Sequence, residues 1–205
     1  MRTVAILPVK SFGRAKQRLG IAVPDKPALA AAMLADVLAA LARVPELDEV
    51  IVVTAEPAAA DAARAAGARI VHDPLEAGQS AAAALGIAAT DADRALLVPG
   101  DCPALDPFEV STLLKGSDPL CRVVIVPDRH GTGTNALLLT PPDAIEPAFG
   151  PGSFERHREL AGNASVAELH SLTLDIDTPD DLATLLAGSA NAPRTRALLG
   201  EAAAA

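Results

Sequence analysis

Aromatic residues are scarce in this chain of 205 residues, which contains four Phe and neither Trp nor Tyr. Proteins that bind single-stranded nucleic acid stack the bases on aromatic side chains, so that class of function lacks its usual platform here. Half of the residues are nevertheless hydrophobic. We therefore expect an aliphatic core of Val, Ile, Leu and Ala in a single domain over residues 1–205, of which residues 188–205 form an Ala-rich tail.

Positive charge is also in short supply. The chain has 17 Lys and Arg against 26 Asp and Glu, a formal net charge of −9. An acidic protein repels a phosphate backbone, so we expect no nucleic acid among its partners. One short basic cluster stands out near the amino terminus: Lys10, Arg14, Lys16 and Arg18. Its size suits one triphosphate better than a polymer.

Several common signatures are absent. The two cysteines, Cys102 and Cys121, have neither zinc-like spacing nor the number that a disulfide framework needs. The first apolar run, Thr3–Val9, is too short for a signal peptide, and no charge-free apolar stretch is long enough to cross a membrane. The chain also contains neither Gly-Lys-Ser/Thr nor GxGxxG, which excludes a Walker A loop and a dinucleotide fingerprint. We expect a cytoplasmic protein without membrane contact.

Compact apolar runs alternate with Ala-rich helical segments along most of the chain. The expected strands are Thr3–Val9, Glu49–Thr54, Ala68–His72, Arg94–Val98, Arg122–Pro127, Asn135–Thr140 and Leu172–Ile176. The expected helices are Pro27–Arg43, Pro57–Ala66, Gly78–Ala89, Pro107–Leu114, Gly152–Leu160 and Pro179–Leu186. This alternation predicts a Rossmann-like α/β fold with a mostly parallel sheet and helices on both faces. Ligands of such sheets bind beyond the carboxyl ends of the strands.

The segment after the first expected strand, residues 8–19, carries the basic cluster around Gly13. Lysine and arginine side chains together with backbone N–H groups can converge on a polyphosphate. The alternative is an ordinary solvated basic turn.

Acidic side chains mark two further segments at expected strand ends. Asp101 follows the strand that ends at Val98, and Asp175 and Asp177 alternate with Ile176, so both carboxylates face the same side. One or two carboxylates facing bound phosphates are typical of Mg²⁺ sites. In the alternative interpretation, Asp101 only caps the short helix after it, and one of the later aspartates only caps the helix that begins at Pro179.

Two Gly-punctuated stretches, residues 128–139 and 149–157, offer a place for a second substrate. The second of them puts Gly150 and Ser153 just before an expected helix, whose amino terminus can bind an anion. Ordinary turn chemistry is the alternative for both stretches. The four histidines, at positions 72, 130, 157 and 170, are scattered, so we expect each to be structural or exposed.

Taken together and in order, these motifs resemble one family. VAILPVKSFGRAKQRL, VPGDCPAL, PDRHGTGTNALLL, FGPGSFERH and LDIDTPDDL are similar to segments of the guanylyltransferases of deazaflavin (coenzyme F-420) biosynthesis. That family belongs to the GT-A-like nucleotidyltransferases and activates phosphoenolpyruvate or 2-phospho-L-lactate with GTP. The resemblance spans nearly the whole chain.

The resemblance implies a role for each matching position. Asp101 and Asp177 would hold a catalytic Mg²⁺, with Asp175 as a candidate third ligand, and Lys10 and Lys16 would meet the GTP phosphates. The phosphorylated acid would contact Thr134, Gly150 and Ser153. Gly78 and Ser80 would bind GTP, although Gly78-Gln79-Ser80 departs from the Gly-Leu-Asn that is usual in the family.

The implied reaction needs no protein base, because a phosphate oxygen of the acceptor, already ionised at neutral pH, attacks the α-phosphorus of GTP. We expect phosphoenolpyruvate as the acceptor, with 2-phospho-L-lactate and 3-phospho-D-glycerate as alternatives. A downstream transferase of the same pathway is a further expected partner. A molybdopterin guanylyltransferase and a nucleotide-sensing module without activity are the competing functions.

Overall fold

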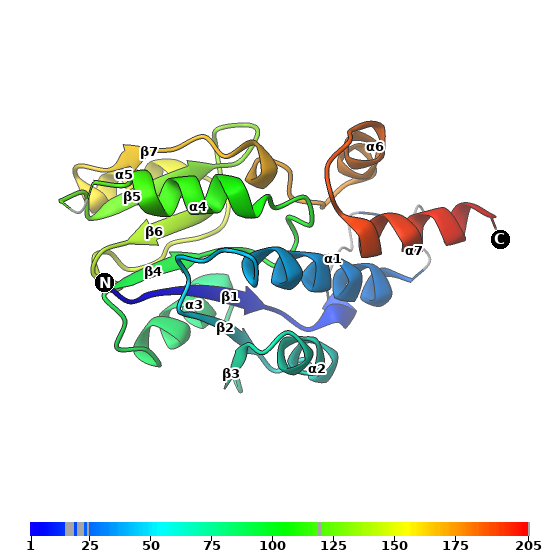
Figure 1. Cartoon of the computed structure of the whole chain (residues 1–205), viewed down its shortest axis with the longest axis horizontal. Coiled ribbons are helices and arrows are strands. Elements are labelled where there is room, and N and C mark those ends of the chain that lie inside the picture. The colour runs from blue at the N-terminus through cyan, green and yellow to red at the C-terminus, as the bar shows by residue number, and fades with distance from the viewer. Residues whose placement is uncertain (15–18, 20–22, 24, 119, 205) are drawn as a thin grey trace.

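The computed structural model describes residues 1–14, 19, 23, 25–118 and 120–204 of the chain. In this part of the chain seven strands form one sheet in the order β3-β2-β1-β4-β6-β5-β7 (Figure 1). β1 pairs in parallel with β2 and β4, β2 with β3, and β5 with β7, while β6 runs antiparallel to both β4 and β5. The predicted α/β fold with a mostly parallel sheet is confirmed.

All but one of the predicted elements lie within a few residues of the observed ones. The strands are β1 Thr3–Val9, β2 Glu49–Thr54, β3 Arg69–His72, β4 Arg94–Leu97, β5 Val123–Pro127, β6 Thr134–Leu139 and β7 Ser165–Val166. The α-helices are α1 Lys26–Leu41, α2 Pro57–Ala65, α3 Gln79–Ala88, α4 Pro107–Gly116, α5 Ser153–Ala161, α6 Pro179–Ala187 and α7 Pro193–Ala204. Two 3₁₀ helices, η1 Phe12–Arg14 and η3 His170–Leu172, complete the described elements.

Apolar side chains cover both faces of the sheet, as the continuous apolar runs of its strands predicted. On β1, Ala5 and Leu7 face a core cluster shared with α1, α2 and α4, whereas Val4 and Ile6 face a second cluster shared with α3 and α5. All four side chains are fully buried. Helices therefore pack on both faces of the sheet, and the central strands are shielded from water (Figure 1).

The predicted strand Leu172–Ile176 is wrong. Its first residue ends the 3₁₀ helix η3, and the residues that follow form no strand. Leu172 and Ile176 are indeed buried, but the Ile176 N–H donates to the carbonyl of Asp101 at 3.0 Å instead of joining a strand ladder. Alternating apolar residues indicate which side chains are buried, and a strand also requires a neighbouring strand to pair with. The short strand β7, which the sequence did not indicate, pairs with β5 instead.

The Ala-rich tail, for which the sequence predicted no structure, forms helix α7 against α1 (Figure 1). Asp36 of α1 is buried and holds the start of this helix. Its carboxylate accepts hydrogen bonds from the backbone N–H of Arg194 at 3.1 Å and of Thr195 at 2.9 Å. A side chain on α1 thus supplies the polar partner that the amino terminus of α7 needs.

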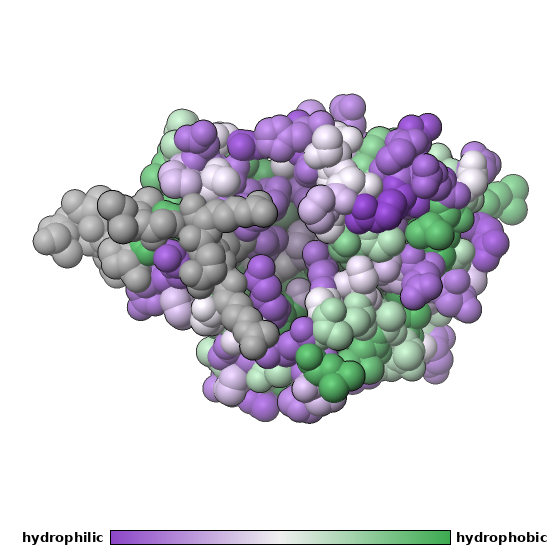
Figure 2. Space-filling model, turned by 180° about the vertical axis from the view of Figure 1, so that it is seen from behind, coloured by the Kyte–Doolittle hydropathy of each residue, from purple (hydrophilic) through white to green (hydrophobic). Residues whose placement is uncertain are grey.

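The face of the molecule in Figure 2 carries hydrophilic residues over much of its area, with apolar residues gathered toward the lower right. Among the described helices, none combines the length and the apolar character that crossing a membrane would require.

Candidate active site

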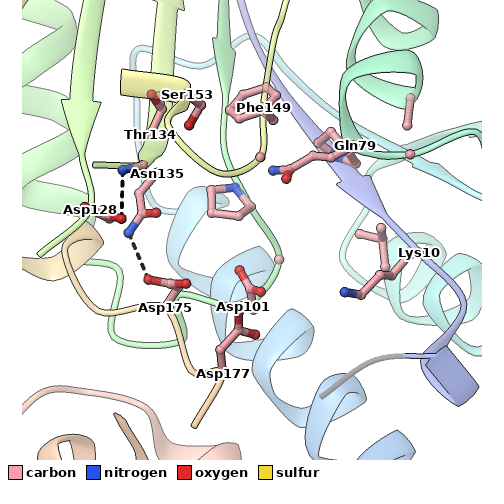
Figure 3. Close-up of a pocket in the computed structure, with 18 of the residues that line it drawn as sticks. Lys10, Gln79, Asp101, Asp128, Thr134, Asn135, Phe149, Ser153, Asp175 and Asp177 are labelled. Atoms are coloured by element: carbon pink, nitrogen blue, oxygen red, sulfur yellow. Dashed lines mark hydrogen bonds between the residues drawn. The ribbon is translucent and has the colours of Figure 1, made fainter. Parts of the chain in front are cut away.

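Residues from the segments that were predicted to form the site line one pocket of about 800 Å³. It opens at the edge of the sheet where the parallel strands β1 and β4 end, and the loop between β5 and β6 and the start of α5 complete its walls (Figure 3). The predicted site residues that line it are Lys10, Gly78, Asp101, Thr134, Gly150, Ser153, Asp175 and Asp177. Lys16 lies outside the described residues.

Lys10 directly follows β1, and its ammonium group points into the pocket (Figure 3). The backbone after it is fixed from two sides. The N–H of Ser11 donates to a carboxylate oxygen of Glu76 at 3.0 Å, and the N–H of Phe12 donates to Glu56 at 2.9 Å. Two carboxylates from neighbouring segments thus hold the loop that presents Lys10.

Asp101 and Asp177 meet in the pocket although they are far apart in the sequence. The hydrogen bond from the Ile176 N–H to the Asp101 carbonyl joins their two segments directly, and the two side chains lie close together in Figure 3. Because this contact is made by the backbone, it sets the relative position of the two segments whatever occupies the pocket.

Neither aspartate serves as a helix cap, the alternative role that the sequence allowed. The carboxylate of Asp106 caps α4 by accepting from the N–H of Phe108 at 2.9 Å. Thr178 caps α6 in a reciprocal arrangement with Asp181. The capping interpretation of Asp101 and Asp177 is therefore wrong.

Asp175 lies beside this pair on the same side of the chain, as the alternation around the buried Ile176 predicted. Its burial, followed by the negative charge of Asp101, raises the pKa of the Asp175 carboxyl group. The amide of Asn135 is directed at the same carboxylate, with its nitrogen 3.4 Å from an oxygen of Asp175 (Figure 3). The three aspartates therefore concentrate negative charge at one end of the pocket.

This donor set fits a divalent cation that is shared with a bound ligand. Among the described residues, no group of three His, Cys, Asp or Glu side chains is arranged as a ready-made metal site. Mg²⁺, however, is commonly held by only one or two carboxylates and completes its octahedral coordination with water and substrate phosphate oxygens. Asp101 and Asp177 offer that number of oxygen ligands.

Two hydroxyl groups and a glycine-rich turn line the other end of the pocket. Thr134 is the first residue of β6, and Ser153 is the first residue of α5, where the N–H groups of Ser153 and Phe154 donate to the carbonyls of Gly150 and Thr132 at 3.0 and 3.2 Å. Gly150 has a φ of 114° and Gly152 a φ of 72°, backbone angles that residues other than glycine rarely adopt. The chain can therefore turn sharply here and bring the start of α5 to the pocket. The hydroxyl groups of Thr134 and Ser153 can donate to an anion there.

Asp128, which was not among the predicted site residues, shapes the loop before Thr134. Its carboxylate accepts from the backbone N–H groups of His130 and Thr132 at 3.0 Å and of Gly133 at 2.9 Å. Asp128 also lines the pocket. An Asp at the start of a Gly-rich loop is a signal for this local bonding that the sequence did offer.

The structure places Ser80 differently from the expectation. Its hydroxyl oxygen accepts a hydrogen bond from the N–H of Phe149 at 2.8 Å, and it is not among the residues that line the pocket. The neighbouring Gln79, which was not among the predicted site residues, presents its amide there instead (Figure 3). Ser80 thus connects α3 to the loop that carries Gly150.

His157, on α5, is fully buried and hydrogen-bonded at both ring nitrogens. Its Nδ1 lies 2.9 Å from the hydroxyl of Thr134, and its Nε2 accepts from the N–H of Ala148 at 2.9 Å. Burial, followed by the positive charge of Arg156, lowers the pKa of His157 to about 4. The histidine is therefore neutral at physiological pH. It is structural, as expected, but it directly contacts a residue of the pocket.

The lowered pKa of His157 predicts acid sensitivity of the fold. Between pH 6.5 and pH 4 the unfolded chain binds a proton at this histidine that the folded chain does not, so stability falls as the pH falls through this window. The free energy of unfolding should lose about 2 kcal/mol between pH 7 and pH 5 from this group alone. Urea unfolding at both pH values measures the loss. It should shrink in His157→Gln and persist in His72→Gln, since His72 is exposed.

Comparison with known proteins agrees with this geometry. A family model described as guanylyl transferase CofC like matches residues 3–199. A phosphoenolpyruvate guanylyltransferase of Conexibacter woesei is 48% identical over 195 residues, which cover 90% of this chain and 87% of that protein. A protein of the same name from Thermomonospora curvata is 41% identical over 203 residues, covering 94% of this chain and 86% of its own length.

Solved structures show the same fold at low sequence identity. A protein from Desulfovibrio desulfuricans named as a nucleotide-diphospho-sugar transferase superposes with a TM-score of 0.73 at 20% identity, over 100% of this chain and 96% of that one. A CMP:2-keto-3-deoxy-manno-octonic acid synthetase complexed with CTP gives 0.62 at 18% identity, over 90% and 97% of the two chains. These structures share the predicted α/β fold of this chain.

Proposed function

This chain belongs to the family of CofC-like guanylyl transferases, and from that premise we propose that it transfers the guanylyl group of GTP to phosphoenolpyruvate and releases pyrophosphate. The observation that carries the proposal is the backbone hydrogen bond from Ile176 to Asp101, which holds Asp101 and Asp177 together at one end of a pocket whose other end suits an anion. That arrangement supports a reaction between two phosphate-bearing substrates.

In the proposed reaction, an oxygen of the acceptor's phosphate attacks the α-phosphorus of GTP. A new P–O bond forms, the bond from the α-phosphorus to the bridging oxygen of the β-phosphate breaks, and pyrophosphate leaves with that oxygen. The attacking oxygen is already ionised at pH 7, so no residue has to remove a proton from it. The protein's contribution is then positioning and charge neutralisation.

Each end of the pocket has its own part in this proposal. Lys10 neutralises charge on the phosphates of GTP and, together with Lys16 of the same segment, stabilises the leaving pyrophosphate. Asp101 and Asp177 would hold Mg²⁺, with Asp175 next to them. When bound, Mg²⁺ would neutralise the negative charge of the phosphate oxygens that it contacts.

Thr134, Gly150 and Ser153 would bind the phosphorylated acid through two hydroxyl groups and the turn at Gly150. On the nucleotide side, we assign the contact with the base to Gly78 and Gln79, because Gln79 lines the pocket and the Ser80 hydroxyl already bonds to Phe149. Ser80 would then support GTP binding only through its neighbours.

The product would join the acid to GMP through a phosphoanhydride, which is an activated linkage. We therefore expect a downstream transferase to consume it. A nucleotide-sensing module without activity would need no site for a second substrate, so the hydroxyl-lined end of the pocket that holds Asp101 and Asp177 weighs against that alternative.

The test is a pyrophosphate-release assay with Mg²⁺, GTP and one acid at a time: phosphoenolpyruvate, 2-phospho-L-lactate or 3-phospho-D-glycerate. We expect the highest kcat/KM with phosphoenolpyruvate and no release when the acid is omitted. Replacing GTP by ATP tests the choice of nucleotide in the same format. A higher kcat/KM with another acid would move the proposal to that acceptor, and no release with any of them would refute it.

A further inference from the structure

His157 links the two segments that form the anion-binding end of the pocket. One ring nitrogen contacts Thr134 at the start of β6, and the other contacts Ala148 in the loop that leads to Gly150. The ring of Phe149 packs edge-on against the imidazole, with the ring centroids 5.2 Å apart. The histidine is thus held from three sides behind the pocket wall.

The two hydrogen bonds decide where the proton of the ring resides. A backbone N–H can only donate, so the Nε2 atom that Ala148 contacts must be the unprotonated acceptor. In a neutral imidazole the proton then sits on Nδ1, which donates to the Thr134 hydroxyl oxygen at 2.9 Å. That oxygen receives the histidine's hydrogen, and the hydrogen of the hydroxyl itself remains available to another acceptor.

We propose that His157 is a positioning residue that turns the Thr134 hydroxyl hydrogen into the pocket, where it donates to an anionic oxygen of the acid substrate. This inference rests on the proposed function, because it concerns the acceptor of that reaction. Thr134 lines the pocket (Figure 3), whereas His157 is not among the residues that line it, so the histidine acts through the threonine.

Burial makes the arrangement effective. Thr134 is only 7% exposed and His157 is fully buried, so water does not compete for the bond between them. The neutral state of the ring matters too, because protonation at Nε2 would place two donors against each other at Ala148. The same histidine therefore fixes both the direction of the threonine hydroxyl and the position of the loop before Gly150.

Two substitutions separate the two contacts of the ring. The side-chain amide of His157→Asn lies near the position of Nδ1 and can still donate to Thr134, whereas that of His157→Gln reaches the position of Nε2 and can only serve Ala148. Thr134→Val removes the hydroxyl while keeping the shape of the side chain. The double variant Thr134→Val/His157→Gln completes a cycle.

We expect Thr134→Val to raise the KM for phosphoenolpyruvate about 10- to 100-fold, the range for losing a hydrogen bond to a charged group, and His157→Gln to raise it roughly tenfold. The KM for GTP should stay unchanged in both. In the Thr134→Val background His157→Gln should add nothing further, and His157→Asn should restore the KM to within a few-fold of that of the unmodified protein.

Additive effects in the cycle, an equal rise in the KM for GTP, or an unchanged KM for phosphoenolpyruvate in His157→Gln would each overturn the proposal and leave His157 as a packing residue. Thermal unfolding of each variant identifies any that has merely lost its fold. If His157→Gln is one of them, the KM for phosphoenolpyruvate of His157→Asn is compared with that of the unmodified protein instead.

A measurement without turnover separates this proposal from the proposed function. The ¹⁵N chemical shifts of labelled histidines in the unmodified protein should show one neutral ring protonated at Nδ1, and this signal should disappear in His157→Gln. If the protein releases pyrophosphate with none of the acids while that signal is present, the proposed function fails and the histidine arrangement stands. If the ring is protonated at Nε2 in an active enzyme, only the positioning role fails.

Discussion

Replacing Asp101 by Asn is expected to abolish measurable turnover, a fall in kcat of about a thousandfold or more, while the fold stays intact. The substitution keeps the size of the side chain and removes one negative charge from the end of the pocket that faces Asp177. The backbone carbonyl of Asp101, which receives the N–H of Ile176, is unchanged. The loss therefore reports on the carboxylate alone.

The measurement is pyrophosphate release over a range of Mg²⁺ concentrations, together with a thermal melt. Asp143→Asn makes the same change of charge at an exposed position away from the pocket and should keep full activity. Asp177→Asn should resemble Asp101→Asn. Normal turnover in a folded Asp101→Asn protein would refute its assigned role, and a large drop in melting temperature would show that the carboxylate stabilises the fold instead.

The largest expected effect on stability comes from Gly86 in α3. A Cβ at this position would lie 2.4 Å from a methyl carbon of Ile6 and 2.9 Å from one of Val53, closer than nonbonded carbon atoms approach. Ile6 and Val53 are fully buried in β1 and β2 and have no space to move into. We expect Gly86→Val to lower the free energy of unfolding by about 3 kcal/mol or more, at the upper end of overpacking effects.

Urea unfolding of Gly86→Val against Gly116→Val measures this cost. Gly116 ends α4 and nothing lies within 4 Å of a Cβ built there, so its variant should lose about 1 kcal/mol at most. Equal stability of the two variants would contradict the close approach of α3 to the sheet. Because Gln79 starts this helix, a displaced α3 should also raise the KM for GTP.

Most of the sheet could be predicted from the sequence for a simple reason. Thr3–Val9 and Glu49–Thr54 are apolar runs between polar turns, and both were predicted with the bounds that the structure shows. A strand buried on both faces needs a continuous apolar run, and that pattern is visible without any knowledge of its neighbours. Helix starts were also predictable where Pro occupies the first turn, as in α2 and α6.

Prediction failed where an element depends on a distant partner. The segment Leu172–Ile176 has the apolar alternation of a strand, but the backbone of Asp101 is its neighbour and no strand ladder forms. Strand β7 exists because β5 lies beside it. Helix α7 depends on the buried carboxylate of Asp36, which is more than 150 residues away from it in the chain. Local sequence patterns do not reveal contacts between segments that are far apart in the chain.

The amino-acid sequence by itself determined the aliphatic α/β sheet, the order of its segments and which of them carry acidic, basic and hydroxyl groups, because these features depend on local composition and periodicity. Only the tertiary structure decided how the groups meet. It brought Asp177 beside Asp101 through the backbone hydrogen bond from Ile176 to Asp101. It also placed Gln79 at the pocket in place of Ser80, and His157 behind Thr134. Each of these depends on the distance and direction between side chains on different segments, which are fixed only when the whole core packs.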